Sequence, residues 1–211
     1  MMSPRVRNPP GAMIMMAAGV KPRDWVLDVC AAPGGKSFSA ALEMKDLGEI
    51  VACDLHKNKL RRIEEGARRL GLTSIRAVAA DGRAFHPEWN ARFDVVLADV
   101  PCSGLGIIRK KPDIRYKRPN DLFALPVVQR AILDNASRYV RPGGTLLYST
   151  CTILPEENQD VTGGFLAEHP EFSLESFTLP GLAGSCGGEI TLWPQRYDTD
   201  GFYICRMTRR T

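Results

Sequence analysis

The chain contains no long hydrophobic run. None of its stretches approaches the roughly 20 apolar residues that a membrane-spanning helix needs, so we expect no membrane partner. Hydrophobic residues make up 44% and charged residues 25%, which is normal for a soluble globular protein. An apolar stretch at residues 12–18 follows Arg5 and Arg7, as in a short signal peptide, but it leads directly into Lys21, Pro22 and a strand-like run. That continuation favours a helix packed on the domain.

The spacings typical of zinc sites are also missing. There is no CxxC pair, and His56, His86 and His169 stand at no metal-ligand spacing from the six cysteines, so we expect no metal. Glycines surround Cys186, which predicts a flexible loop there. The other cysteines favour reduced thiols and a cytoplasmic protein over a disulfide framework. Four of them end or lie within apolar, strand-like runs: Cys30, Cys53, Cys151 and Cys205.

Short apolar runs alternate with amphipathic segments along the chain. Strands are expected at residues 25–30, 49–53, 75–80, 93–98, 145–149, 172–177 and 202–207. Helices are expected at residues 37–44 and 58–70, from Asn120 to Val140, and from Pro155 onward, with turns at Gly71 and at residues 142–144. This alternation predicts an α/β fold with a mostly parallel sheet and helices on both faces.

The expected strand ends carry most of the chemically interesting residues. Ligands of such sheets bind beyond the carboxyl ends of the strands. Each acid there could separately be a helix cap or a surface residue. Together on one edge of the sheet they indicate a ligand site, formed by Cys30, Asp54, Asp81, Asp99 and Cys151.

The loop after the first strand, residues 30–36, is glycine-rich but fits neither common phosphate-binding motif. A dinucleotide site needs G-x-G-x-x-G, and Cys30 stands where a P-loop has its first glycine. Gly34 and Gly35 would let a ligand approach the backbone, and Lys36 could meet a carboxylate. Asp54 holds the position of a ribose-pairing acid, and Asp81 could accept a hydrogen bond from an adenine amine. A nucleoside with an amino-acid tail fits best, and S-adenosylmethionine is the obvious candidate.

Two further cysteines stand in unusual contexts. Cys102 follows Asp99, Val100 and Pro101, and Cys151 lies in the run Ser-Thr-Cys-Thr. Free cysteine is often simply buried, which is what we expect of Cys53 and Cys205. Two thiols beside a cofactor loop instead suggest that one sulfur attacks an electron-poor ring and the other helps to undo the bond.

Residues 28–36, 99–104 and 149–152 resemble, in order, the motifs of RNA cytosine-C5 methyltransferases, although Val100 stands where that family usually has alanine. Residues 108–115 resemble the B branch of the bacterial small-subunit ribosomal RNA methyltransferases (Sun/Fmu type, within the NOL1/NOP2/Sun superfamily), and residues 200–203 resemble its closing motif. The resemblance implies a Rossmann-like class I methyltransferase fold with seven strands, the last antiparallel. Residues 21–211 would form the catalytic domain after a lead-in segment, residues 1–20. Members of the B branch usually carry an N-terminal helical RNA-binding domain, for which we expect no room before Lys21.

The resemblance also implies roles for single residues. Cys151 would be the nucleophile, Cys102 the helper for product release, and Asp99 an acid serving both the cofactor and the base. The implied contacts with S-adenosylmethionine are Cys30, Ala31, Ala32, Pro33, Gly34, Gly35, Lys36, Asp54, Asp81 and Asp99.

The chemistry explains these residue types. Cytosine C5 is too weak a nucleophile to take a methyl group directly, and a thiolate bonded to C6 makes it reactive. The target base must leave its stack, so a single-stranded RNA is expected, most simply 16S small-subunit ribosomal RNA. Alternatives are a transfer RNA or another RNA, a small-molecule or protein substrate, and an RNA-binding module without activity.

Positive charge clusters directly after Cys102. Between residues 109 and 118 six basic side chains face a single acid, although the net charge of the chain is only +4. The cluster is either a solvated loop or a surface for phosphates, and its position beside the proposed site and Tyr116 favours RNA. The residues that we expect to contact RNA are Arg109, Lys110, Lys111 and Arg115.

Overall fold

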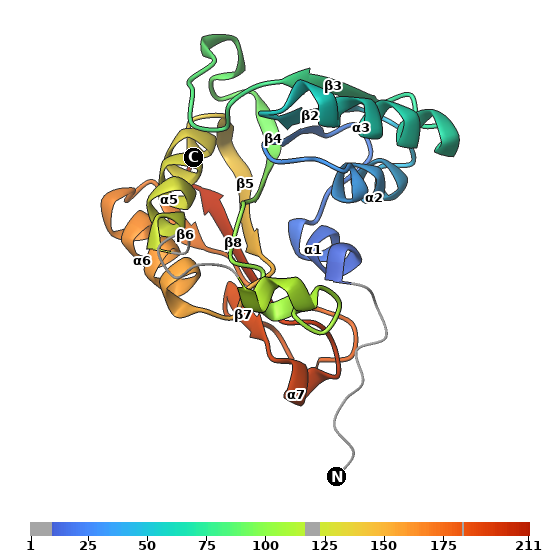
Figure 1. Ribbon diagram of the computed structural model, residues 1–211. Helices are drawn as coiled ribbons and strands as arrows, with labels where there is room; N and C mark the ends of the chain where they lie inside the picture. The colour runs from blue at the N-terminus through green and yellow to red at the C-terminus, as the bar shows by residue number, and fades with distance from the viewer. Residues whose placement is uncertain (1–9, 117–122, 183) are drawn as a thin grey trace.

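The structure, a computed structural model, describes residues 10–116, 123–182 and 184–211 (Figure 1). The described residues contain eight strands in one sheet, in the order β3-β2-β1-β4-β5-β8-β6, with β7 also paired to β8. The strands are β1 (Trp25–Asp28), β2 (Glu49–Asp54), β3 (Ile75–Ala79), β4 (Phe93–Asp99), β5 (Val140–Thr150), β6 (Phe172–Leu174), β7 (Glu189–Leu192) and β8 (Phe202–Arg209).

The first five strands run parallel, and β8 is antiparallel to β5. This confirms the expected fold class. β6 and β7 share the outer edge of β8, because β6 pairs with residues 207–209 and β7 with residues 202–205. The sheet therefore has one strand more than the seven expected. The additional strand, β7, is only four residues long and follows a glycine-rich segment.

Helices cover both faces of the sheet (Figure 1). On one face lie α1 (Pro10–Ala18), α2 (Gly35–Glu43) and α3 (Lys57–Leu70), and on the other lie α5 (Leu125–Ser137) and α6 (Gln159–Glu168). A short helix, α7 (Pro194–Tyr197), precedes β8. The described part of the chain also contains 3₁₀ turns at Pro87–Trp89, Leu105–Ile107, Pro112–Tyr116 and Pro155–Glu157. The expected start of the fifth helix, at Asn120 and Asp121, falls outside the described residues.

Alternate residues of the central strands point into two hydrophobic cores, one on each face of the sheet. Val26, Ile50 and Leu97 point to the face that carries α1 and α2. Leu27 and Val96 point to the face that carries α5 and α6. Because side chains alternate across a strand, continuous apolar runs such as that of β4 supply both cores at once.

The N-terminal apolar stretch forms α1 and packs on the domain, as expected. Met13, Ile14 and Ala17 are completely buried against α2, β5 and β8. Within the described ranges, no helix is both long and apolar enough to cross a membrane.

Several local predictions are wrong. The fifth helix, α5, ends at Ser137, and Val140, the expected end of that helix, begins β5. Residues 141–144 do not form a separate turn before a strand but bulge within β5, opposite Asp94, between the pairs Phe93–Val140 and Val95–Thr145. An ion pair between Arg141 and Asp94 (2.6 Å) joins this bulge to β4. Around Cys186, where the sequence predicts a flexible loop, the cysteine side chain is buried and its backbone forms a bridge with Phe177.

Candidate active site

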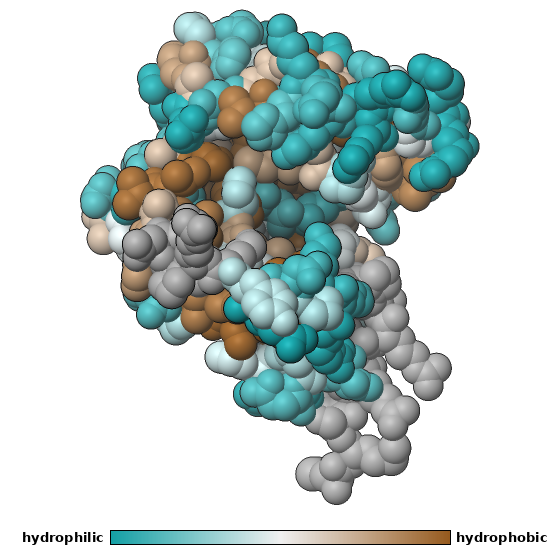
Figure 2. Space-filling model, viewed as in Figure 1, coloured by the Kyte–Doolittle hydropathy of each residue, from teal (hydrophilic) through white to brown (hydrophobic). Residues whose placement is uncertain are grey.

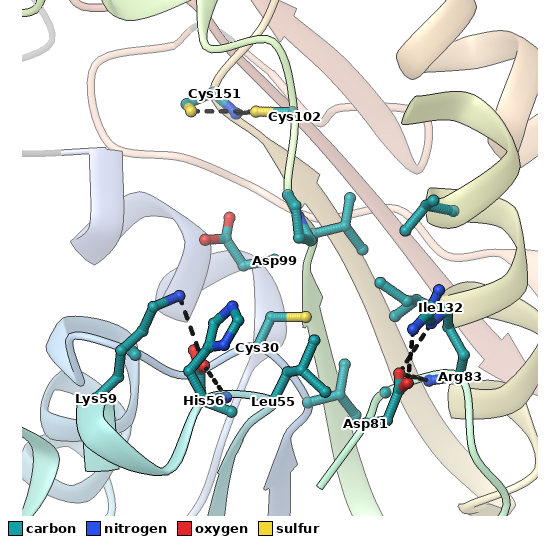
Figure 3. Close-up of a pocket in the computed structure, with 17 residues that line it drawn as sticks. Cys30, Leu55, His56, Lys59, Asp81, Arg83, Asp99, Cys102, Ile132 and Cys151 are labelled. Carbon is teal, nitrogen blue, oxygen red and sulfur yellow. Dashed lines mark hydrogen bonds and ion pairs between the residues drawn. The ribbon is translucent and has the colours of Figure 1, made fainter. Parts of the chain in front are cut away.

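The carboxyl ends of the parallel strands surround a cavity of about 450 Å³ (Figure 3). The face shown in Figure 2 is hollowed between the part of the molecule that carries α3 and the part that carries α7. Segments that follow β1, β2, β3, β4 and β5 contribute to the cavity wall. The site residues expected from the sequence that line it are Cys30, Ala32, Asp54, Asp81, Asp99, Cys102 and Cys151.

The two cysteines face each other at one end of the cavity (Figure 3). Cys102 follows β4 and Cys151 follows β5, and these neighbouring parallel strands are in register at Asp99 and Ser149. Their sulfur atoms lie 3.2 Å apart, and the backbone N–H of Cys151 also donates to Cys102 Sγ (3.3 Å). The pair has hydrogen-bond geometry, and both cysteines are free thiols.

The pKa values of the two cysteines are shifted in opposite directions. A hydrogen bond from the Cys102 thiol lowers the pKa of Cys151, and this effect, helped by Lys36, outweighs burial and the nearby charge of Asp99. The same hydrogen bond, together with burial, raises the pKa of Cys102. The arrangement therefore favours a thiolate on Cys151 and a protonated Cys102, which makes Cys151 the better nucleophile.

Asp99 lies between the thiol pair and Cys30 in the view of Figure 3. Its carboxylate forms an ion pair with Lys36 and accepts a hydrogen bond from Ser149 Oγ (2.7 Å). Burial lowers the pKa of Lys36, but the charge and hydrogen bond of Asp99 outweigh it, so the net pKa is raised and the amine stays protonated. Lys36 thus meets a carboxylate of the protein itself.

A second carboxyl, Asp28, is completely buried at the end of β1. Ser37 Oγ donates to its Oδ2 (2.7 Å), while Oδ1 has no hydrogen-bond partner in the described part of the chain. Burial raises the pKa of Asp28 from 3.8 to about 6, against the opposing effects of Ser37 and Lys36. The carboxyl of Asp28, beneath the site, therefore loses its proton at a pH near its raised pKa of about 6.

We expect Asp28 to make the protein less stable as the pH rises. Between pH 3.8 and about 6 the unfolded chain loses this proton before the folded one, so the free energy of unfolding falls, and above pH 6 the loss is complete. The total fall in the free energy of unfolding is about 3 kcal/mol. In Asp28→Asn this contribution disappears, so the variant should gain about that much relative to wild type between pH 4 and pH 7 in urea denaturation. Parallel pH profiles for the two proteins would contradict the assignment.

Asp54 and Asp81 both line the cavity and both close local turns. Asp54 accepts from the backbone N–H of His56 (2.9 Å) and lies 3.6 Å from Lys59 Nζ. Asp81 accepts from the backbone and the guanidinium of Arg83, which lowers its pKa. Each of these side chains thus closes a local turn and also lines the cavity.

The glycine-rich loop contributes less to the cavity than expected. Cys30 and Ala32 line the cavity, whereas Ala31, Pro33, Gly34, Gly35 and Lys36 are not part of its wall. Gly34 has a left-handed φ of 109°, and a Cβ there would fall 2.4 Å from the ring of Phe38. The glycine at position 34 is therefore required by packing, whatever approaches the loop from the other side.

Sequence reasoning did not assign several cavity residues to the site. They come from the turn after β2 and the start of α3, from the turn after β3, and from α5: Leu55, His56, Lys59, Gly82, Arg83, Val128 and Ile132. Val128 and Ile132 belong to an apolar helix face whose spacing predicts core packing only. Their place in the site depends on how α5 crosses the strand ends.

The basic cluster after Cys102 is exposed. Arg109, Lys110, Lys111 and Arg115 all reach solvent, and Lys110 forms an ion pair with the buried Asp200 (2.5 Å). The segment is joined to the site, because the N–H of Gly106 donates to the carbonyl of Cys151 (3.0 Å). Lys117 and Arg118 lie outside the described residues.

Comparison with known proteins identifies the family. The family model of the 16S rRNA methyltransferases RsmB/F matches residues 15–208. The chain belongs to this family. A probable ribosomal RNA small subunit methyltransferase B of Bacillus subtilis is 42% identical over 97% of this chain and 47% of its own length. A ribosomal RNA small subunit methyltransferase F of Serratia proteamaculans is 35% identical, over 91% of this chain and 41% of its own.

A solved structure of the same fold supports the family assignment. The crystal structure of NSun6 from Pyrococcus horikoshii with SFG has a TM-score of 0.85 and 31% identity, covering 96% of this chain and 52% of that one. The chain therefore spans about half the length of the curated RsmB/F relatives that it matches. Among the residues that the structure describes, no cluster of three or more histidine, cysteine or carboxylate side chains could hold a metal ion.

Proposed function

We propose that this chain is the catalytic part of an S-adenosylmethionine-dependent methyltransferase that acts on C5 of cytosine in RNA. The observation that supports this function best is the contact between Cys102 and Cys151, 3.2 Å apart on the wall of the cavity. Methyl transfer to oxygen or to an amine needs no thiol pair, whereas addition to C6 of cytosine needs a nucleophile and a second group to end the reaction.

The cavity suits S-adenosylmethionine. A volume of about 450 Å³ is in the range of sites for small ligands. Asp54 and Asp81 would hold the ribose hydroxyls and the adenine amine, and the apolar side chains of Leu55 and Ile132 lie on the same wall. We also expect the backbone of the glycine-rich loop, residues 30–36, to contact the amino-acid tail. When bound, this cofactor supplies an electrophilic methyl group.

Cys151 begins the reaction. Its thiolate adds to C6 of cytosine, the C5–C6 double bond opens, and electron density gathers at C5, which takes up the methyl group. The carboxylate of Asp99 is suited to accept a hydrogen bond from the N4 amine of the base, and its ion pair with Lys36 holds it in place. Cys102 donates to Cys151 beforehand and so keeps the attacking sulfur ionised.

Cys102 ends the reaction. Once the sulfur of Cys151 is bonded to carbon, its negative charge no longer opposes the ionisation of Cys102. Cys102 then loses its thiol proton to solvent, and its thiolate, or a water molecule that it orients, removes the C5 proton. The C6–sulfur bond breaks at the same time, and Cys151 leaves as a thiolate.

The substrate that we propose is single-stranded or looped small-subunit ribosomal RNA, by analogy with the names of the B and F relatives. The reaction is tested with a 16S transcript that carries tritium at C5 of its cytosines. Methylation at C5 must release that tritium in an amount equal to the methyl groups incorporated. Methyl incorporation without tritium release would place the methyl group elsewhere and contradict the proposal, and a transfer RNA transcript tests the alternative substrate.

We expect the basic cluster to contribute to RNA affinity. Arg109 and Lys111 are exposed and have no carboxylate partner in the described residues, so each is suited to contact a phosphate. In Arg109→Ala/Lys111→Ala the slope of log K against log salt should fall by roughly 1–2, with weaker binding at low salt. Filter binding over a salt series measures this. Arg61→Ala/Arg76→Ala, on exposed residues of α3 and β3, is the control, and an equal effect there would contradict a specific role for the cluster.

A further inference from the structure

Beyond the strand ends, a buried polar network surrounds the segment that carries Cys102. Its centre is Glu157, in the 3₁₀ turn Pro155–Glu157 that follows β5, with only 2% of the residue exposed. Gln129 of α5 is completely buried beside it. A buried carboxylate is costly unless it is well hydrogen-bonded, so its partners indicate what it is for.

The partners of Glu157 and Gln129 lie on both sides of Cys102. Glu157 Oε2 accepts from the backbone N–H of Ser103 (2.8 Å) and from Gln129 Nε2 (2.8 Å). Gln129 Nε2 also donates to the carbonyl of Pro101 (2.9 Å). The residue before Cys102 and the residue after it are therefore held by one pair of side chains.

A third contact joins this network to the other cysteine. Ser103 Oγ donates to the hydroxyl of Thr152 (2.8 Å), the residue that follows Cys151. Tyr148, within β5, donates from its hydroxyl to the carbonyl of Glu157 (2.6 Å). The turns of both cysteines are thus anchored to a common centre.

We propose that Glu157 and Gln129 are positioning residues that hold the Cys102 thiol in line with the sulfur of Cys151. The inference deepens the proposed function, since it rests on the roles given there to the two cysteines. Neither side chain lines the cavity, and both act through the backbone of residues 101–103. Without them, Cys102 would lose its fixed direction while both thiols remained in the protein.

The ionisation of the Cys151 thiol measures directly whether Cys102 is held in position. Cys151 is alkylated with iodoacetamide over a range of pH in the full chain, without RNA or S-adenosylmethionine, and its modified peptide is followed by mass spectrometry. Cys102→Ala gives the profile of Cys151 without its hydrogen-bond donor. We expect Gln129→Met and Glu157→Met to move the apparent pKa of Cys151 upward by about one unit, toward that profile. Alkylation at pH 7 should slow by up to about tenfold.

Two controls separate positioning from stability. Glu156→Met changes the exposed neighbour of Glu157 and should keep the wild-type profile. Glu157→Gln retains an acceptor for Ser103 and Gln129 and should keep most of the wild-type pH profile of Cys151 alkylation. Unchanged profiles in folded Gln129→Met and Glu157→Met, or unfolding of both variants, would overturn the proposal in favour of a purely structural role. Because the assay uses no RNA, it is independent of methyl transfer, and a failure of the proposed function would show only in the tritium assay.

Discussion

We expect the replacement of Cys151 by alanine to remove nearly all methyl transfer while leaving the fold intact. Three thiols line the cavity, Cys30, Cys102 and Cys151, and only that of Cys151 has a lowered pKa, because of the hydrogen bond from Cys102. Loss of the nucleophile should reduce the rate by at least on the order of 10³-fold. The side chain is small and partly exposed, so the cavity left by the substitution costs little stability.

Tritium release from the RNA measures this effect. Cys186→Ala is the matched control, because Cys186 is a buried thiol on the segment that pairs with Phe177, outside the cavity wall. It should retain wild-type activity. A Cys151→Ala enzyme with more than a few per cent of wild-type activity would contradict covalent catalysis by this residue.

Gly106→Ala should be the most damaging substitution outside the cysteines. A Cβ at Gly106 would lie 2.0 Å from the carbonyl oxygen of Gly201, so one of the two backbones must move. The same glycine donates from its N–H to the carbonyl of Cys151 (3.0 Å) and accepts from the N–H of Gly201 (2.8 Å). The clash therefore displaces the segment between the two cysteines, with a loss of stability of about 2–4 kcal/mol.

Denaturant unfolding and the tritium assay together measure the effect of Gly106→Ala. Gly163→Ala in α6 is the control, since a Cβ there meets nothing within 4 Å. It should raise the free energy of unfolding by about 0.5–1 kcal/mol, because alanine is the better helix former. Equal stability of the two variants would show that the contact between Gly106 and Gly201 does not hold the segment.

The sheet could be predicted because its signals are local. β4 is apolar from Val95 to Ala98 and ends at Asp99. α3 has a 3.6-residue period and stops before Gly71, whose φ of 68° is left-handed and favours glycine. The positions of the strand ends then follow from the parallel topology. For the same reason, the sequence was enough to bring Cys102, Cys151 and Asp99 together.

The features that could not be predicted all depend on distant contacts. β7 pairs with the edge of β8, and Cys186 is buried in a core cluster that also contains Phe177. The sequence predicts that Gly34 lets a ligand approach the backbone, but in the structure the ring of Phe38 lies where a Cβ at position 34 would point. The network of Glu157 and Gln129 joins residues 28 positions apart, and no spacing rule connects them.

The most direct test of the two-cysteine account is the fate of the RNA on Cys102→Ala. The variant is incubated with S-adenosylmethionine and a 16S transcript and run on a denaturing gel, beside wild type and Cys102→Ala/Cys151→Ala. The account predicts a slow, protease-sensitive RNA band for Cys102→Ala alone, because Cys151 still adds to C6 but the bond is no longer released. If that band is absent while wild type methylates the same transcript, the roles assigned to Cys102 and Cys151 are wrong.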